Sequence, residues 1–175
     1  KTGVISDTQD KLDPATEYIV YAFGLSKTGI VTTSLYKQSF TTLATELTEI
    51  NFEIEVSDIG YDTAKVSVVP DNDKAIYFVN VFSYEDYEYY GGDESAFAEH
   101  LTQLRNYYYN LGATADQMVA NLGFVGAKSL TVEKLKAGTK YMAYAIGIDE
   151  RFIANSVATV VEFETVAAQT SACDR

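Results

Sequence analysis

The sequence has few of the residues that most often build catalytic and metal sites. Its 175 residues include one cysteine (Cys173), one histidine (His100) and no tryptophan. One histidine and one distant cysteine offer little material for a metal cage, a disulfide framework or a catalytic triad. We therefore expect a chain that is not an enzyme and that holds no cofactor and no metal.

Basic residues are also few. Thirteen Lys and Arg face 25 Asp and Glu, which gives a formal net charge of -12. This charge repels phosphate backbones and anionic lipid headgroups alike. In addition, no apolar run reaches the roughly 20 residues that a spanning helix needs. The sequence thus predicts no nucleic-acid partner and no direct membrane insertion by this fragment.

Core-forming residues, by contrast, are plentiful. Hydrophobic residues make up 47% of the chain and aromatic residues 13%, with only two prolines. This composition excludes a disordered or low-complexity chain. The length suits one large domain or two small ones and needs no covalent staple.

The sequence repeats part of itself at an offset of 123 residues. Thirteen of the forty positions from 3 to 42 are identical to those from 126 to 165, without a gap. Chance would give about two or three such identities. The best-matched segments are LDPATEYIVYAFG at 12–24 and LKAGTKYMAYAIG at 135–147. A gapless match through a loop predicts the same hairpin twice.

This repeat predicts the domain organisation. If 126–165 ends a domain, residues 1–43 are the last strands of a first domain, and 44–166 form a complete second domain. The start of the first domain, about 80 residues by the length of the second copy, would then precede this fragment. A two-stranded annex that packs on the second domain is the alternative. Residues 167–175 are expected to be a polar tail or linker.

Alternating apolar residues predict strands over much of the second domain. Residues 50–57, 63–69 and 75–82 follow this pattern, and strands are expected again at about 129–132, 139–148 and 157–165. The total is six or seven. Between the early and late strands, Ser83 can cap a short helical turn. Asp93 and Thr114 are the expected N-caps of two helices, the first with an apolar stripe.

Tyr18 and Tyr141 follow the two matched leucines by six residues and begin strands. In Greek-key sandwiches, a tyrosine placed in this way can return its hydroxyl to the backbone of the preceding corner. A ligand-stacking tyrosine is the alternative. The spacing and the duplication favour a structural tyrosine corner at both positions.

The motif L-x-P-x-T-x-Y, an alternating strand, a glycine turn and a closing F-x-T resemble the end of fibronectin type III-like modules. The segment FSYEDYEYYGGDESAFAEHLTQLRNYYYNLG resembles a helical insert in such a module. The resemblance implies a mainly β, Greek-key sandwich with a two-helix insertion at about 83–125, preceded by a partial second copy. It also implies tandem modules in secreted proteins or surface lipoproteins of Gram-negative gut anaerobes, and hence an extracellular or outer-membrane location.

A tyrosine-rich segment is the best candidate for a binding surface. Tyrosine brings a large contact area, few rotatable bonds and a polar tip, so it suits protein interfaces and sugar stacking. Packing between the helical insert and the sheet is the alternative interpretation. If these residues form a surface, we expect it at Tyr87, Tyr89, Tyr90 and Tyr107.

Three weaker candidates remain. Asp62-Thr63-Ala64 matches a short O-glycosylation pattern of those bacteria, with Thr63 as acceptor. The turn at 71–73 offers carboxylate and amide oxygens, but it lacks the spacing of a calcium loop, so solvated turn residues are expected. His100 is expected on a helix surface. Cys173 is either incidental or the partner of a cysteine outside the fragment.

Taken together, these features predict a non-enzymatic extracellular module that acts as a spacer or protein-interaction unit. A glycan-binding accessory module that uses the tyrosine-rich insert is one alternative, and an accessory region of a secreted hydrolase is another. Expected partners are a protein or glycan at the cell surface and neighbouring domains of the same parent chain.

Overall fold

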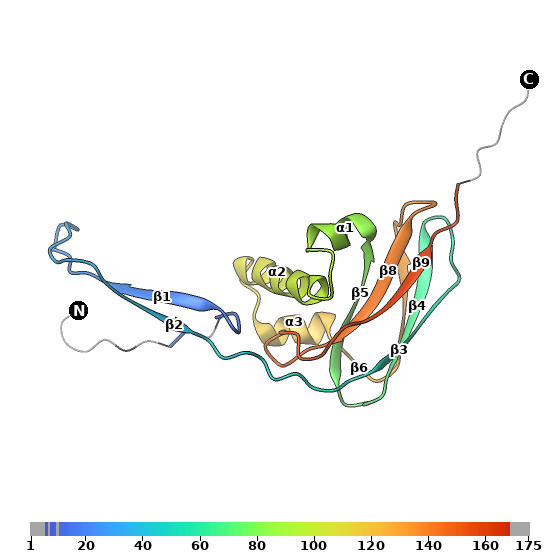
Figure 1. Cartoon of the computed structure of the whole chain (residues 1–175), viewed down its shortest axis with the longest axis horizontal. Coiled ribbons are helices and arrows are strands. Elements are labelled where there is room, and N and C mark those ends of the chain that lie inside the picture. The colour runs from blue at the N-terminus through green and yellow to red at the C-terminus, as the bar shows by residue number, and fades with distance from the viewer. Residues whose placement is uncertain (1–5, 7, 10, 169–175) are drawn as a thin grey trace, which may run out of the picture. The chain divides into compact units, whose positions relative to one another are not determined.

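The computed structural model of the chain describes residues 6, 8–9 and 11–168 (Figure 1). It separates into two compact units, unit 1 (Lys1–Thr45) and unit 2 (Glu46–Arg175). No helix in the described part of the chain combines the length and the apolar character that crossing a membrane requires.

Unit 1 is a two-stranded antiparallel hairpin. Strand β1 (Glu17–Ala22) pairs with β2 (Tyr36–Thr41), and Tyr18 lies opposite Phe40. The rings of these two residues stack with centroids 5.9 Å apart. Beyond the strands, an isolated bridge between Leu25 and Val31 continues the pairing into the loop.

Unit 2 contains two antiparallel sheets. The first has the order β3-β4-β7 and the second has the order β6-β5-β8-β9. The strands are β3 (Phe52–Ser57), β4 (Thr63–Pro70), β5 (Ile76–Ser83), β6 (Phe124–Val125), β7 (Lys128–Glu133), β8 (Lys140–Gly147) and β9 (Thr159–Glu164). This mainly β architecture of antiparallel sheets with a few helices agrees with the sequence-based expectation.

The two sheets enclose the first of two cores. Alternate residues of β4, namely Ala64, Val66 and Val68, are buried, as their spacing predicts. They belong to one apolar cluster with Phe52 of β3, Tyr77 of β5 and residues of β8 and β9. Burial of one face from each sheet against the other is the defining feature of a β-sandwich.

Three helices lie between β5 and β6 in the sequence, where two helices and a capped turn are expected. They are α1 (Tyr84–Tyr89), α2 (Ala96–Asn110) and α3 (Ala115–Leu122). The turn after Ser83 is α1 itself, closed by a capping box between Ser83 and Asp86. Thr114 caps α3 in the same way through Gln117, as the sequence predicts.

The prediction of Asp93 as the N-cap of α2 is wrong. The N-cap position is Ser95, whose side chain makes no capping hydrogen bond. The Asp93 carboxylate instead accepts hydrogen bonds from the backbone N–H and the hydroxyl of Ser95. Asp93 therefore shapes the turn that leads into the helix. The helix stops as expected, since Gly112 follows the C-cap with a positive φ of 87°.

A second core joins the helices to the other face of the second sheet. The α2 stripe supplies Phe97 and Leu101, which are buried, with Leu104 and Tyr108 packed beside them. This cluster also contains Tyr144 of β8. Both faces of β8 are thus buried, and burial is continuous from Tyr141 to Gly147.

The β8–β9 hairpin of unit 2 repeats the β1–β2 hairpin of unit 1 bond for bond. The Tyr141 hydroxyl accepts a 2.8 Å hydrogen bond from the Lys136 N–H, and the Tyr18 hydroxyl accepts one of 2.8 Å from the Asp13 N–H. Each bond is the one that a tyrosine corner makes with the backbone ahead of its strand.

Threonines that close the two hairpins are equivalent as well. The Thr165 hydroxyl donates to the Lys136 carbonyl at 2.6 Å and accepts from the Thr139 N–H at 3.0 Å. Thr42 makes the same two bonds, with the Asp13 carbonyl at 2.6 Å and the Thr16 N–H at 3.0 Å. The two copies therefore share a geometry and not only a sequence pattern.

Candidate functional site

The four tyrosines predicted to form a binding surface separate into two pairs. Tyr89 of α1 is 76% exposed and Tyr107 of α2 is 58% exposed. Tyr87 and Tyr90 are half-buried and pack against the second core. Of these four tyrosines, solvent therefore reaches mainly Tyr89 and Tyr107, and the binding role of the set stays a prediction.

Tyr90 contributes to folding rather than to an open surface. Its ring stacks on Phe82 with centroids 5.5 Å apart and an interplanar angle of 9°. Burial raises the pKa of the Tyr90 hydroxyl, and the neighbouring Tyr89 adds to this rise. Tyr87 similarly lies 5.8 Å from Phe97, measured between ring centroids.

The prediction that His100 lies on a helix surface is wrong. Its Nδ1 shares a 2.8 Å hydrogen bond with the hydroxyl of Tyr144, which is fully buried. Its ring lies 4.7 Å from that of Phe82 and 5.2 Å from that of Tyr90, between centroids. His100 is therefore a polar part of the aromatic core, and its hydrogen bond satisfies a hydroxyl that burial would otherwise penalise.

Burial lowers the pKa of His100 below 6.5, and the Asp86 carboxylate partly opposes this shift. The pKa of Tyr144 is raised, chiefly by burial. The hydroxyl thus keeps its proton, and the imidazole favours its neutral form in the folded state.

This shift predicts a pH dependence of stability. As the pH falls below about 6.5, the unfolded chain binds a proton that the folded chain resists, so the free energy of unfolding decreases. We expect His100→Gln to reduce that slope by less than about 1.4 kcal/mol per pH unit, the limit for one proton. Urea unfolding between about pH 5 and 7 measures it. Identical slopes for both proteins would contradict the assignment.

Arg105 is a buried cation that the sequence analysis does not predict. It belongs to α2 and is 2% exposed. Its guanidinium carbon lies 5.9 Å from the centroid of the Tyr109 ring. Burial lowers the pKa of Arg105, whereas Tyr109 and Asp149 favour its charged form. Arg105 follows the buried Leu101 by four residues, which places it on the apolar side of α2, although its charge would favour solvent.

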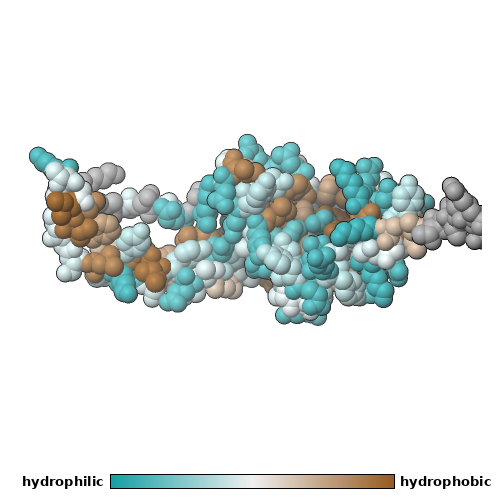
Figure 2. Space-filling model, turned by 90° about the horizontal axis from the view of Figure 1, so that it is seen from above, coloured by the Kyte–Doolittle hydropathy of each residue, from teal (hydrophilic) through white to brown (hydrophobic). Residues whose placement is uncertain are grey.

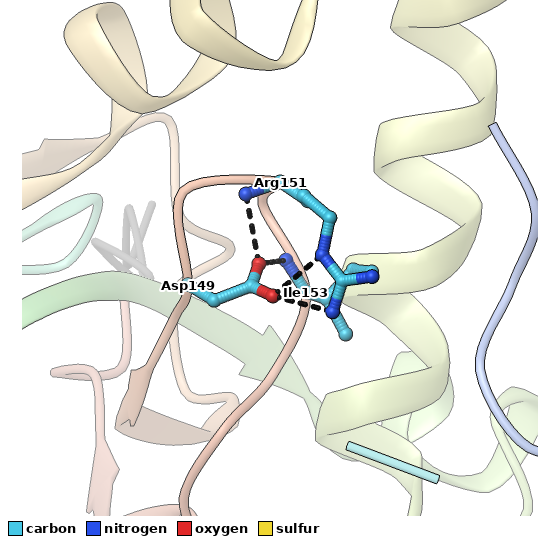
Figure 3. Close-up of polar contacts among 3 residues, drawn as sticks. All are labelled: Asp149, Arg151 and Ile153. Atoms are coloured by element: carbon cyan, nitrogen blue, oxygen red, sulfur yellow. Dashed lines mark hydrogen bonds and ion pairs between the residues drawn. The ribbon is translucent and has the colours of Figure 1, made fainter. Parts of the chain in front are cut away.

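The loop between β8 and β9 is organised by one carboxylate (Figure 3). Asp149 accepts hydrogen bonds of 2.9 Å from the backbone N–H groups of Arg151 and Ile153. It also forms a 2.9 Å ion pair with the Arg151 guanidinium. In the first copy Ser26 replaces this aspartate, and its hydroxyl accepts from the Ile30 N–H at 3.0 Å. The loop geometry thus survives a change of residue.

A shallow cleft of about 490 Å³ lies where α1 begins. Its lining combines carboxylates of α1 with three lysines; the residues are Ser83, Tyr84, Glu85, Asp86, Lys134, Lys136, Thr139, Lys140 and Tyr141. The Tyr84 hydroxyl donates to Glu162 at 2.6 Å, and this bond is the main cause that raises the pKa of Tyr84. Charges of both signs in one open cleft favour neither a cation nor an anion.

The weaker candidates have ordinary structural positions. Asp71 accepts hydrogen bonds from the backbone and side chain of Asn51, which lower its pKa, so it joins two strand ends. Thr63 is half-buried at the start of β4. Its glycosylation stays a prediction. Within the described residues, no three His, Cys, Asp or Glu side chains gather as a metal site would require. Cys173 lies outside the described residues.

Comparison with known proteins gives low-similarity structural neighbours. No family model matches the sequence, and no curated protein matches it. The sensor domain of the anti-sigma factor RsgI4 of Pseudobacteroides cellulosolvens is 14% identical, with a TM-score of 0.42, covering 73% of this chain and 99% of that one. Rat CD45 domains d3–d4 are 16% identical, with a TM-score of 0.33, covering 93% and 70%. Chicken CNTN1 domains FN1–FN3 are 11% identical, with a TM-score of 0.36, covering 89% and 44%.

Proposed function

We propose that this chain is part of a secreted bacterial surface protein built from tandem Greek-key, fibronectin type III-like modules, and that these modules are non-enzymatic spacers or protein-interaction units. The observation that carries the proposal is the repeated hairpin. Its two copies share strand register, tyrosine corner and closing threonine. Repetition of one structural unit along a chain is typical of modular proteins whose specific chemistry resides elsewhere.

The insert of unit 2 gives this module a distinctive surface. Tyr89 and Tyr107 are the exposed aromatic residues of α1 and α2 that were predicted for binding, and each can contribute a large rigid contact. A protein partner is favoured over a glycan, because sugar-stacking sites usually include tryptophan and this chain has none.

A glycan array tests this proposal against its main alternative. We expect that neither Tyr89→Ala nor Tyr107→Ala reduces any glycan binding that the chain shows. The matched control is Tyr61→Ala, which removes a tyrosine of similar exposure (61%) from the loop between β3 and β4. Binding that both insert variants abolish and the control retains would instead establish a glycan-binding module.

A further inference from the structure

The β1–β2 hairpin exposes residues whose counterparts in unit 2 are buried. Ile19, Val20 and Tyr21 are 60%, 57% and 64% exposed. Their counterparts at the 123-residue offset are Met142, Ala143 and Tyr144, which are 4%, 0% and 0% exposed. Figure 2 shows hydrophobic residues as brown areas on the surface of unit 1, at the left of the view. Such exposure of successive apolar residues on both faces marks an interaction surface.

On the edge of β1 that faces away from β2, the backbone N–H and C=O groups of alternate residues are available for pairing with another strand. The Thr42 N–H donates to the Thr16 carbonyl, and the Thr32 N–H donates to the Gly24 carbonyl, so even-numbered residues of β1 bond toward β2. Because antiparallel bonding alternates along a strand, the N–H and C=O of Ile19 and Tyr21 point to the opposite edge. Among the described residues, no strand pairs with that edge.

Unit 2 shows what covers the equivalent edge. Strand β5 pairs antiparallel with β8, with Phe82 opposite Met142 and Asn80 opposite Tyr144. The Ile148 N–H donates to the Ile76 carbonyl at 3.0 Å, so even-numbered residues of β8 bond toward β5. At the 123-residue offset these are the odd-numbered residues of β1. The donors and acceptors of the β1 edge therefore have the spacing that a β5-like strand requires.

The side chains of the hairpin also suit packing by elements like those that pack on β8 and β9 in unit 2. On the face that meets β3 and β4 in unit 2, Tyr141 and Phe163 are buried, and their counterparts are Tyr18 and Phe40. On the face that meets the helices, Tyr144 is buried, and its counterpart is Tyr21. These three aromatic side chains thus have the same identity in both copies, so a segment that packs on one hairpin finds the same aromatic contacts on the other.

We propose that the free edge and both faces of the β1–β2 hairpin are a docking surface for a β3–β5-like segment of the same parent chain. This segment would precede the hairpin and add a strand antiparallel to β1, as β5 precedes and pairs with β8. The proposal goes beyond the suggested spacer role, because it concerns completion of the first module and holds whatever that module binds.

A duplication within the full chain tests the proposal. Residues 46–125 are inserted a second time directly before Gly3, so that the added Val125 is followed by Gly3 as the original is followed by Gly126. We expect hydrogen exchange at the Ile19 and Phe23 amides to slow by at least about tenfold relative to the chain without the insertion, because these N–H groups gain strand partners. The β8 amides of unit 2 report in the same sample that the protein is folded.

Two proline variants of the duplicated chain provide the matched control. Tyr21→Pro removes an N–H group from the proposed docking edge. It leaves the hydrogen bonds between β1 and β2 in place, because the Tyr21 N–H does not point toward β2. Ser39→Pro makes the same change on the outer edge of β2, whose counterpart in β9 pairs with no further strand among the described residues. We expect the first variant to restore fast exchange and the second to retain protection. Unchanged exchange on insertion, or equal effects of the two prolines, would overturn the proposal.

Discussion

Replacing Phe82 with alanine is expected to lower the free energy of unfolding of unit 2 by about 3–5 kcal/mol. Phe82 is 3% exposed, and its ring lies within 5.7 Å of those of Tyr90, Phe97, His100 and Tyr144, between centroids. Phe82 of β5 therefore contacts aromatic residues of the helical insert on one side and Tyr144 of β8 on the other. The truncation removes the contacts that fix the insert to the sheet and leaves a cavity that its rigid neighbours cannot fill.

The matched control for this prediction is Tyr89→Ala, which removes an equally aromatic but exposed residue from the adjacent helix. We expect its cost to stay below about 1 kcal/mol. Denaturant unfolding followed by circular dichroism measures both values. Similar losses for the two variants would show that the insert does not depend on the second core.

Thr165→Val is expected to cost about 2–3 kcal/mol, although valine has nearly the shape of threonine. Thr165 is 3% exposed, and its hydroxyl bonds both the Thr139 N–H and the Lys136 carbonyl. Valine leaves these two backbone groups without their partner beside the tyrosine corner. Thr131→Val, at an exposed position of β7, is the control, and we expect it to change stability by less than about 0.5 kcal/mol.

The same unfolding experiment decides this second prediction. A cost for Thr165→Val no larger than that for Thr131→Val would contradict the closing role of the threonine hydroxyl. It would also remove the main reason to regard Thr42 as the equivalent element of unit 1.

The sequence predicts the sheets and most helix boundaries because local rules decide them. The two-residue alternation in β4 and the repeated stripe of α2 each match the observed burial. Thr114 is correctly predicted as a cap, since its partner Gln117 lies only three residues away. The cap predicted at Asp93 is wrong, because its carboxylate bonds to Ser95 in the turn before the helix. A short-range sequence pattern does not show which of the two arrangements is more stable.

The contents of the aromatic core could not be predicted in the same way. His100 and Arg105 are five residues apart on α2, and their polarity favours the solvent side in any local analysis. Where each of them lies depends on contacts with distant parts of the chain, such as the hydrogen bond between His100 and Tyr144 of β8, and a local pattern does not reveal such contacts. The same reason explains why Tyr87 and Tyr90 pack inward while Tyr89 stays exposed, although all belong to one short tyrosine-rich run.

Cross-strand Hα–Hα contacts, measured by nuclear Overhauser spectroscopy, test most directly whether the two hairpins are copies of one structure. Residues at non-hydrogen-bonded positions of antiparallel strands bring these protons closest together. The account predicts such contacts between Ile19 and Ser39 and between their counterparts Met142 and Glu162. Contacts of Ile19 with Gln38 or Phe40, or of Met142 with a residue other than Glu162, would establish different registers and contradict the duplication.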